Sequence, residues 1–211
     1  MKMNTFKTQM LCVSTAINYH VRSFIYVNGE RFRSGDELKL LGYYLGRRPR
    51  PDVHVREMRR KFGARAWILR ILKHASIPEK RLVQVYMSLV RPILEYPSNV
   101  FHPSLTDELS ESLERLQRVA LKSIFGLDKS YNECLKLSGL PRLDQRRSDL
   151  LLDFAKKNSA SPLYGPLWFP PKEKSGYLLR KEEKFKQEFA ARERLQKAPI
   201  YAMRALLNNT T

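Results

Sequence analysis

The chain has 211 residues, 43% of them hydrophobic, so it can form one packed domain with an appendage and is not wholly disordered. Its 39 Lys and Arg against 21 Asp and Glu give a formal net charge of +18, which favours a polyanionic partner, either nucleic acid or an anionic membrane surface. The sequence has no apolar run of membrane-spanning length, no signal-peptide pattern and only two cysteines, Cys12 and Cys134, so we expect an intracellular protein, cytoplasmic or nuclear, that is not secreted.

Residues 1–46 are predicted to be β-rich. Asn28-Gly29 separates two strand-like runs, 23–27 and 31–33, and is typical of a type I′ turn, because both central residues of that turn need a positive φ. A further apolar run, 38–45, surrounds Gly42. These patterns predict a small antiparallel sheet.

The pattern becomes helical after a basic linker, 47–50. Asp52 is a candidate N-cap, and hydrophobic residues then recur at helical spacing as far as Leu72. Ser76-x-x-Glu79 has the form of a capping box and predicts the start of a second helix.

Proline and glycine mark the ends of the later helices. Pro92 is expected to bend the second helix and Pro97 to stop it. Three more helices are predicted, at 105–125, 131–137 and 143–157. Residues 159–211 are predicted to be a basic tail, partly disordered or helical, with one exposed helix in its charged segment, 181–197.

Half of the excess charge lies between Arg47 and Arg81, where 12 Lys or Arg stand against 3 acids, a net of 12 − 3 = +9. On a helical wheel of about 100° per residue, four arginines and one tryptophan share a face: Arg56, Arg59, Arg60, Arg70 and Trp67. Arginines neutralise phosphates and an indole stacks on a base or sugar, so this face is predicted to bind nucleic acid. A merely solvated face, a core position for Trp67, and attachment to an anionic membrane surface stay open as alternatives.

Several short motifs follow one another along residues 1–160. Residues 4–8 read Asn-x-x-Lys-Thr, and Lys-x-Leu-Gly follows about 35 residues later at 39–42. Residues 86–96 read Tyr-x-x-x-x-Arg-Pro-x-Leu-x-Tyr, and Leu-Glu-x-x-Gln begins at 113. Gly-Leu-Pro occupies 139–141, with an arginine pair soon after it. In this order the motifs resemble the end of the palm, the primer grip, the thumb and the connection of non-LTR retrotransposon reverse transcriptases of the LINE type.

The resemblance implies an α+β fold in which a small antiparallel β remnant of the palm, 1–46, precedes a mostly helical thumb-like domain, 47–158, and the tail. It implies that Lys7 approaches the phosphates of a nucleotide, and that Leu41 and Gly42 form the turn of the primer grip. It also implies two partners, an RNA–DNA hybrid or duplex lying along the thumb, and the palm and fingers of the same element. We expect no membrane partner.

Catalysis is not expected of the chain by itself. Nucleotidyl transfer needs carboxylates that hold two metal ions about 3.5–4 Å apart, and the family supplies them from an aromatic-Ala-Asp-Asp turn. The sequence has no Asp-Asp pair, and its first acids, beginning with Glu30, follow Lys7. No P-loop, nucleophile elbow or iron-binding triad occurs either, so no cofactor or metal is expected. We expect His102 and Cys134 to be ordinary packed or surface residues, and Tyr86, Tyr96 and Phe101 to be core.

The predicted function is therefore that of a non-catalytic carboxyl-terminal fragment of a retrotransposon RNA-directed DNA polymerase, which binds template–primer nucleic acid through a basic thumb helix. Two alternatives from other classes stay open. The chain is either a genomic relic with no selected role as a separate protein, or a helical protein-interaction module that docks through the acidic face at 107–114.

Overall fold

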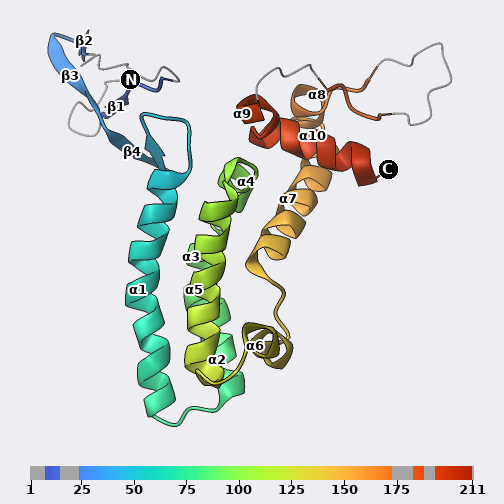
Figure 1. Ribbon diagram of the computed structural model, residues 1–211. Coiled ribbons are helices and arrows are strands. Elements are labelled where there is room, and N and C mark those ends of the chain that lie inside the picture. Colours follow the sequence, from blue (N-terminus) through green and yellow to red (C-terminus); the bar gives the residue numbers. More distant parts are fainter. Residues whose placement is uncertain (1–7, 15–23, 173–182, 188–192, 211) are drawn as a thin grey trace. The chain divides into compact units, whose positions relative to one another are not determined.

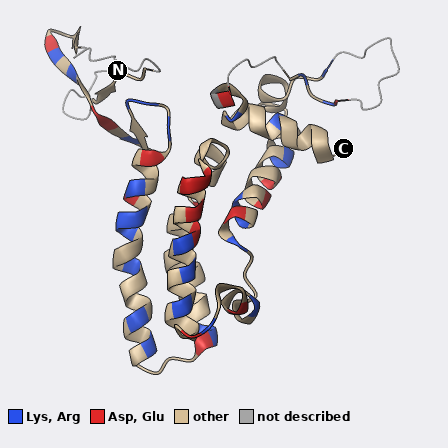
Figure 2. Cartoon of the chain, viewed as in Figure 1, with Lys and Arg blue, Asp and Glu red and all other residues tan. Residues whose placement is uncertain are grey.

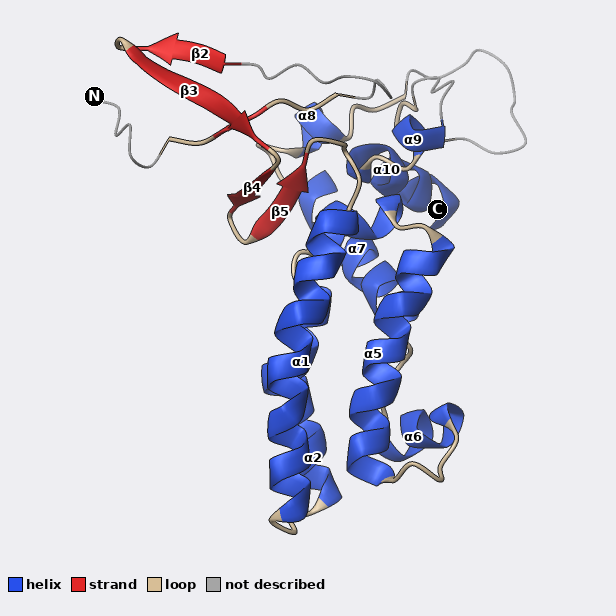
Figure 3. Ribbon diagram, turned by 60° about the vertical axis from the view of Figure 1, so that its left-hand side comes forward, coloured by secondary structure: helices blue, strands red, loops and turns tan. Residues whose placement is uncertain are grey.

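The computed structural model describes residues 8–14, 24–172, 183–187 and 193–210 (Figure 1). The chain divides into two compact units, Met1–Lys61 and Phe62–Thr211, with the boundary inside a helix rather than in the basic linker before it. The named strands lie in the first unit, and the named elements of the second are helical (Figure 3). The α+β class is therefore confirmed, whereas its assignment to a palm remnant and a thumb stays a prediction.

Two small sheets form the first unit. Strand β2 (Phe24–Val27) pairs antiparallel with β3 (Glu30–Gly35), and the intervening turn has positive φ at Asn28 (53°) and Gly29 (81°), as its sequence predicts. Strand β1 (Met10–Leu11) pairs parallel with the other edge of β3, so the expectation of a purely antiparallel sheet was wrong. The reason is that β1 reaches β3 through a distant connection, which local turn chemistry cannot predict.

The second sheet is the hairpin of β4 (Glu37–Leu40) and β5 (Tyr43–Gly46). Its turn has φ of 47° at Leu41 and 87° at Gly42. Two positive φ angles fit a two-residue turn of the type I′ class, although leucine rarely adopts such a backbone. The turn therefore places an unusual residue, Leu41, at the tip of the hairpin.

Helix α1 (Asp52–His74) begins at the predicted residue, and its spaced apolar residues are buried, among them Phe62 and Leu69. The predicted capping box at Ser76 is absent: Ser76 has φ of 56°, and helix α2 (Glu79–Val85) starts after Pro78 without a side-chain cap. Pro78 explains the difference, because a residue before proline is pushed out of the helical region.

Helix α2 continues without a break into a π-helical turn, η2 (Tyr86–Val90), and then into α3 (Arg91–Glu95). Pro92 lacks a backbone N–H and crowds the preceding turn, and the chain widens just before it, with Arg91 N–H bonded to the carbonyl of Tyr86. The helix ends at Glu95, two residues before Pro97, in agreement with the predicted stop. Tyr86 is buried as expected, but Tyr96 is 56% exposed, because it leaves the helix in an extended conformation.

Two short elements, α4 (Ser98–Phe101) and the 3-10 helix η3 (His102–Ser104), lead to α5 (Asp107–Phe125). Thr106 caps α5 by accepting a hydrogen bond from the N–H of Leu109 at 3.3 Å. Acids occupy the first turns of α5 and bases its later turns (Figure 2), an order that complements the helix macrodipole. Helix α6 (Tyr131–Ser138) has a complete capping box from Ser130 and Glu133 and ends at Gly139.

A carboxylate from α5 holds the start of α7 (Leu143–Ser159). Glu114 is 1% exposed and accepts hydrogen bonds from the N–H groups of Leu143 at 3.0 Å and Asp144 at 3.2 Å. The hydroxyl of Tyr131 also donates to this carboxylate. Glu114 thus satisfies the amides that α7 leaves unpaired and fixes α6 and α7 to α5.

The described part of the tail is packed at its end, whereas the short helix inside the predicted charged segment, Glu193–Gln196, is exposed at Glu193, Leu195 and Gln196. Helices α8 (Gly165–Trp168), α9 (Glu193–Gln196) and α10 (Pro199–Thr210) follow α7, and α10 lies against α7 (Figure 1). Their shared core consists of Leu151, Ala155, Phe169, Phe185, Met203 and Leu207. The packing of 199–210 was not predicted, because its apolar positions become a core only against α7. None of the described helices has both the length and the apolar character that crossing a membrane requires.

Candidate nucleic-acid interface

Three residues that the resemblance singled out lie near the amino terminus and in the β4–β5 hairpin. Lys7 lies outside the described residues. Leu41 and Gly42 form the hairpin tip, where the Leu41 side chain is 86% exposed. A large apolar side chain that is both exposed and held at positive φ is an unusual feature, of the kind that functional positions retain.

The arginines of the first unit are exposed but partly engaged. Arg56 donates two hydrogen bonds to the carboxylate of Glu37, at 2.6 and 2.7 Å, and these bonds raise the pKa of its guanidinium above the ordinary value. Arg60 pairs with Glu57 at 3.0 Å, and Arg59 is exposed. Ion pairs in water contribute little, so a phosphate can compete with either glutamate for its arginine.

Trp67 and Arg70 lie in the part of α1 that belongs to the second unit, on successive turns. The Trp67 side chain is 62% exposed, which excludes the alternative of a core tryptophan. Arg70 is exposed too and has no ion pair with any acid that the structure describes. Spaced three residues apart on a helix, the indole and the guanidinium are neighbours on one face.

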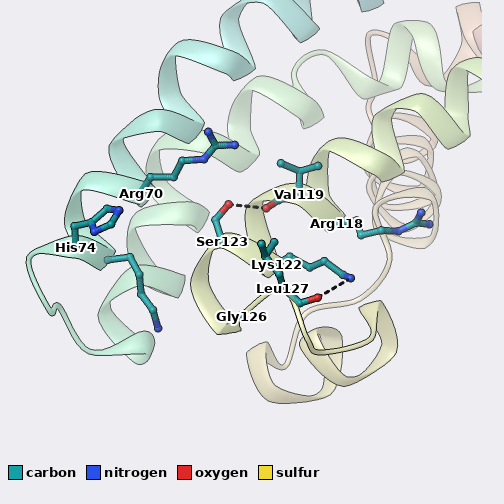
Figure 4. Close-up of a pocket in the computed structure, with 9 residues that line it drawn as sticks. Arg70, His74, Arg118, Val119, Lys122, Ser123, Gly126 and Leu127 are labelled. Atoms are coloured by element: carbon teal, nitrogen blue, oxygen red, sulfur yellow. Dashed lines mark hydrogen bonds between the residues drawn. The ribbon is translucent and has the colours of Figure 1, made fainter.

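Arg70 also belongs to a pocket of about 450 Å³ within the second unit, formed where the last turns of α1 meet the last turns of α5 (Figure 4). Five of its residues are basic and none is acidic. In Figure 4, Arg70 and His74 come from α1, whereas Val119 and Ser123 come from α5 opposite them. The nine lining residues are Arg70, Lys73, His74, Arg118, Val119, Lys122, Ser123, Gly126 and Leu127.

The five basic side chains are not equally available to a ligand. The Arg118 guanidinium lies over the ring of Tyr131, 5.1 Å from its centroid, and donates to Glu111 at 3.2 Å. Lys122 donates to the carbonyl of Leu127 at 3.3 Å. Lys73 pairs with Glu79 at 3.2 Å, in an exposed pair that an anion can displace.

Arg70 and His74 are the two basic residues of the pocket for which the described part of the chain supplies neither an ion pair nor a side-chain hydrogen bond, whereas Lys122 is bonded to the Leu127 carbonyl. They stand at positions i and i+4 of α1 and so share a face of the helix. With cations on both walls and no acid in the lining, the positive potential is concentrated inside a concave surface, which attracts anions.

The base of the pocket depends on the end of α5. The chain leaves this helix at Gly126 with φ of 116°, a conformation that residues with a side chain avoid, and a Cβ there would also collide with Asp128. Leu127 follows and is 81% exposed. Gly126 therefore allows the sharp exit that brings Leu127 to the edge of the pocket.

Sequence reasoning found the α1 half of this interface and missed the α5 half. Arg118 and Lys122 were interpreted only as cations that complement the helix macrodipole near the end of α5, so no binding role was assigned to them. A sequence signal for the α5 half did exist. Arg118 and Lys122 are four residues apart, next to Val119 and Ser123, so both lie on one edge of α5 and make that edge basic. Only the packing of the helices brings that edge to Arg70.

A second cluster looks catalytic but lacks the required partner. His102 Nε2 lies 3.0 Å from Ser148 Oγ, as in a nucleophile–base pair, but its Nδ1 accepts a hydrogen bond from Arg147 Nε at 3.4 Å. A catalytic triad has a carboxylate at that position. Burial and then the charge of Arg147 lower the pKa of His102 to about 4, so the imidazole is too weak a base to activate Ser148.

Within the described residues, no three His, Cys, Asp or Glu side chains are placed to hold a metal ion. Comparisons with protein-family models, with curated proteins and with solved structures found no match.

Proposed function

We propose that this chain binds nucleic acid through the basic interface of α1 and α5, as the thumb and connection of a retrotransposon reverse transcriptase hold a template–primer duplex. One observation carries the proposal: α5 and the last turns of α1, all in the second unit, line a concave surface with five basic side chains and no acid. Such a surface fits a polyanion far better than it fits a neutral or cationic partner.

The exposed face of α1 extends the interface beyond the pocket. Trp67 offers an indole for stacking, and Arg70 offers a planar guanidinium for a phosphate. Backbone phosphates supply most of the affinity in complexes of this kind, and the released counterions make binding weaken steeply with salt. The proposed binding is therefore tolerant of sequence and strong at low ionic strength.

The link to reverse transcriptases rests on the order of motifs along residues 1–160. The primer-grip motif falls in a tight hairpin, and the Tyr-x-x-x-x-Arg-Pro motif falls on η2 and α3, later in the chain than α1, which is compatible with a palm edge followed by a thumb. RNA-directed DNA synthesis by a complete element, and a palm and fingers as partners, belong to this proposal.

Docking of a protein on the acidic face at 107–114 is the weaker proposal. Glu114 is buried and occupied by the amides of α7, and Glu111 pairs with Arg118. The acids left for a partner are those of the first turn, Asp107 and Glu108, where they already stabilise the helix amino terminus.

The proposal is tested by removing three charges from the interface. In the triple variant Arg70→Ala, Lys73→Ala and Lys122→Ala, affinity for a 20-base-pair DNA duplex or RNA–DNA hybrid should fall by about tenfold or more at low salt. The slope of log K against log salt should become shallower by about 0.9 for each phosphate that the protein no longer neutralises. Fluorescence anisotropy with a labelled duplex, between 25 and 200 mM salt, measures both quantities.

The matched control removes the same charge from exposed residues outside the pocket, with Arg65→Ala, Lys80→Ala and Lys156→Ala. Arg65 is the closest comparison, because it lies on α1 but about 140° around the helix from Arg70. The control triple should retain most of the affinity. Equal losses in the two triples would mean that net charge alone drives binding, and no binding of any duplex by the unaltered chain would refute the proposed function.

A further inference from the structure

The pocket between α1 and α5 combines a basic surface with an apolar one, and a duplex backbone needs only the first. This concave site offers apolar side chains from Val119 and Leu127 among its basic residues. Its volume of about 450 Å³ lies in the range of pockets that bind small ligands. The shape therefore suits a group the size of a base and sugar, attached to a phosphate.

We propose that the pocket receives one unpaired nucleotide of a nucleic-acid strand, with its phosphate at Arg70 and His74 and its base against Val119 and Leu127. The inference rests on the proposed function and deepens it, since it states which part of the nucleic acid this site takes. A frayed strand end, or a single overhanging nucleotide at the end of a duplex, supplies such a group.

The phosphate position follows from the two basic pocket residues that have neither an ion pair nor a side-chain hydrogen bond among the described residues. Arg70 presents a planar fork of N–H groups, which matches two phosphate oxygens, and His74 can donate one ring N–H to a third. Both point from α1 toward the space shared with α5 (Figure 4). Lys73 adds a third cation when a phosphate replaces its exposed partner Glu79.

The base position follows from apolar surface that the fold leaves uncovered. The Val119 and Leu127 side chains are 43% and 81% exposed, and both border the pocket. Covering them with a planar base removes apolar area from water without burying a charge. Ser123 donates its hydroxyl hydrogen to the carbonyl of Val119, so its oxygen can still accept a hydrogen bond from the base.

Trp67 gives the strand a path into the site. It precedes Arg70 by three residues on α1, about 4.5 Å along the helix axis, and its indole is 62% exposed. The nucleotide next to the unpaired one can stack there while its neighbour enters the pocket. One face of α1 can therefore contact both the last paired nucleotide and the unpaired nucleotide that follows it.

The experiment compares two hairpin duplexes of identical stem, one blunt and one with a single overhanging nucleotide. We expect the unaltered chain to bind the overhang hairpin about tenfold more tightly, the order of effect that stacking of one base produces. Overhangs at the 3′ and 5′ ends are tested separately, by fluorescence anisotropy at 100 mM salt.

Val119→Glu places a carboxylate inside the pocket, and it should abolish the overhang preference while leaving most binding of the blunt hairpin. Val100→Glu is the matched control, because Val100 is 46% exposed, lies in the same unit and is outside the pocket, so this variant should keep the preference. Ser123→Leu, which fills the pocket without adding charge, should act like Val119→Glu. Circular dichroism establishes that each variant is folded before it is compared.

The outcomes separate the inference from the proposed function. Equal affinity for blunt and overhang hairpins overturns the inference and leaves duplex binding intact. Equal effects of Val119→Glu and Val100→Glu also overturn it, because the pocket is then not the site of the preference. If vesicles rich in phosphatidylserine bind and neither hairpin does, the inference and the proposed function both fall.

Discussion

The two units of this chain reach stability in different ways. In the first unit, the strand residues Phe24, Ile25 and Tyr26 are 47, 47 and 65% exposed, and Gly46 is the one buried residue among the described strands. In the second unit, long apolar side chains such as Leu121 and Ile124 are fully buried, together with polar side chains that bond to one another. A two-layer fold needs one face of a sheet covered. In the first unit the start of α1 covers the β4–β5 hairpin, where the rings of Tyr43 and His54 lie 4.5 Å apart, but the side chains of Phe24, Ile25 and Tyr26 in β2 stay exposed.

The contrast indicates which unit can hold binding side chains in fixed positions. The second unit has its own hydrophobic core and a buried network around Glu114, so its basic pocket stands on fixed helices. The hairpin tip at Leu41 stands on two short strands. Binding that depends on positioned side chains is therefore expected from the second unit, and adaptable contact from the first.

The largest expected difference between the units is the effect of removing apolar atoms. Leu121→Ala should lower the free energy of unfolding by about 2–5 kcal/mol, because it opens a cavity in a filled core. Ile25→Ala, at a half-exposed strand position, should change it by less than about 0.5 kcal/mol. Urea unfolding followed by circular dichroism measures both, and similar losses in the two variants would show that the first unit has an equivalent core.

A smaller effect separates two glycines of the second unit. Gly126→Ala should cost about 1–3 kcal/mol, because φ of 116° is strained for any residue with a side chain. Gly63→Ala should instead stabilise by about 0.5–1 kcal/mol, because Gly63 lies inside α1 with open space around it. Thermal unfolding of the pair gives the comparison, and two shifts of the same sign would contradict the described end of α5.

The pH dependence of stability should arise in the second unit. Burial and the charge of Arg147 lower the pKa of His102 to about 4, against about 6.5 in an unfolded chain. The folded state therefore favours the neutral imidazole, and stability is lost as pH falls from about 6.5 toward 4. The loss should be on the order of 1–2 kcal/mol, allowing for the partial exposure of the ring.

Urea unfolding between pH 4.5 and 7 measures this loss in the unaltered chain and in His102→Gln, whose curve should be flatter. Asp144 and Glu133 also have lowered pKa values, but their carboxyl groups protonate below this window. A variant that keeps the full pH dependence would show that another group is responsible.

The helix ends show most clearly which structural features local sequence predicts. Helix α6 was predicted at 131–137 and spans Tyr131–Ser138, and Asp52 opens α1, because these boundaries depend on residues within one turn. Ser76 misled the same reasoning, because Pro78 restricts Ile77 and delays the helix. Local rules therefore predicted the helix ends except where the capping-box pattern at Ser76 conflicted with the restriction from Pro78.

The pocket lay beyond such rules because its walls come from segments far apart in the chain. Arg70 was predicted from the wheel of its own helix, whereas the part played by Lys122 and Val119 depends on where α5 lies against α1. The burial of Met203 and Leu207 was missed for the same reason, since their partners Leu151 and Ala155 belong to α7. Periodicity indicates that a face is apolar but does not name the surface that covers it.

The smallest expected effect concerns Arg56, whose guanidinium the helical wheel assigns to nucleic acid. Glu37 occupies it through two hydrogen bonds at 2.6 and 2.7 Å, in a solvent-exposed pair. Glu37→Gln should leave stability unchanged within error, because exposed pairs contribute little, and should raise affinity for a duplex by less than about threefold at low salt. Glu30→Gln is the matched control, since it removes the same charge from an exposed strand residue of the same unit and has no described ion pair. If both variants raise affinity equally, the gain comes from net charge and Arg56 has no special contact; if Glu37→Gln alone raises it, the first unit adds an adaptable contact to the fixed interface of the second.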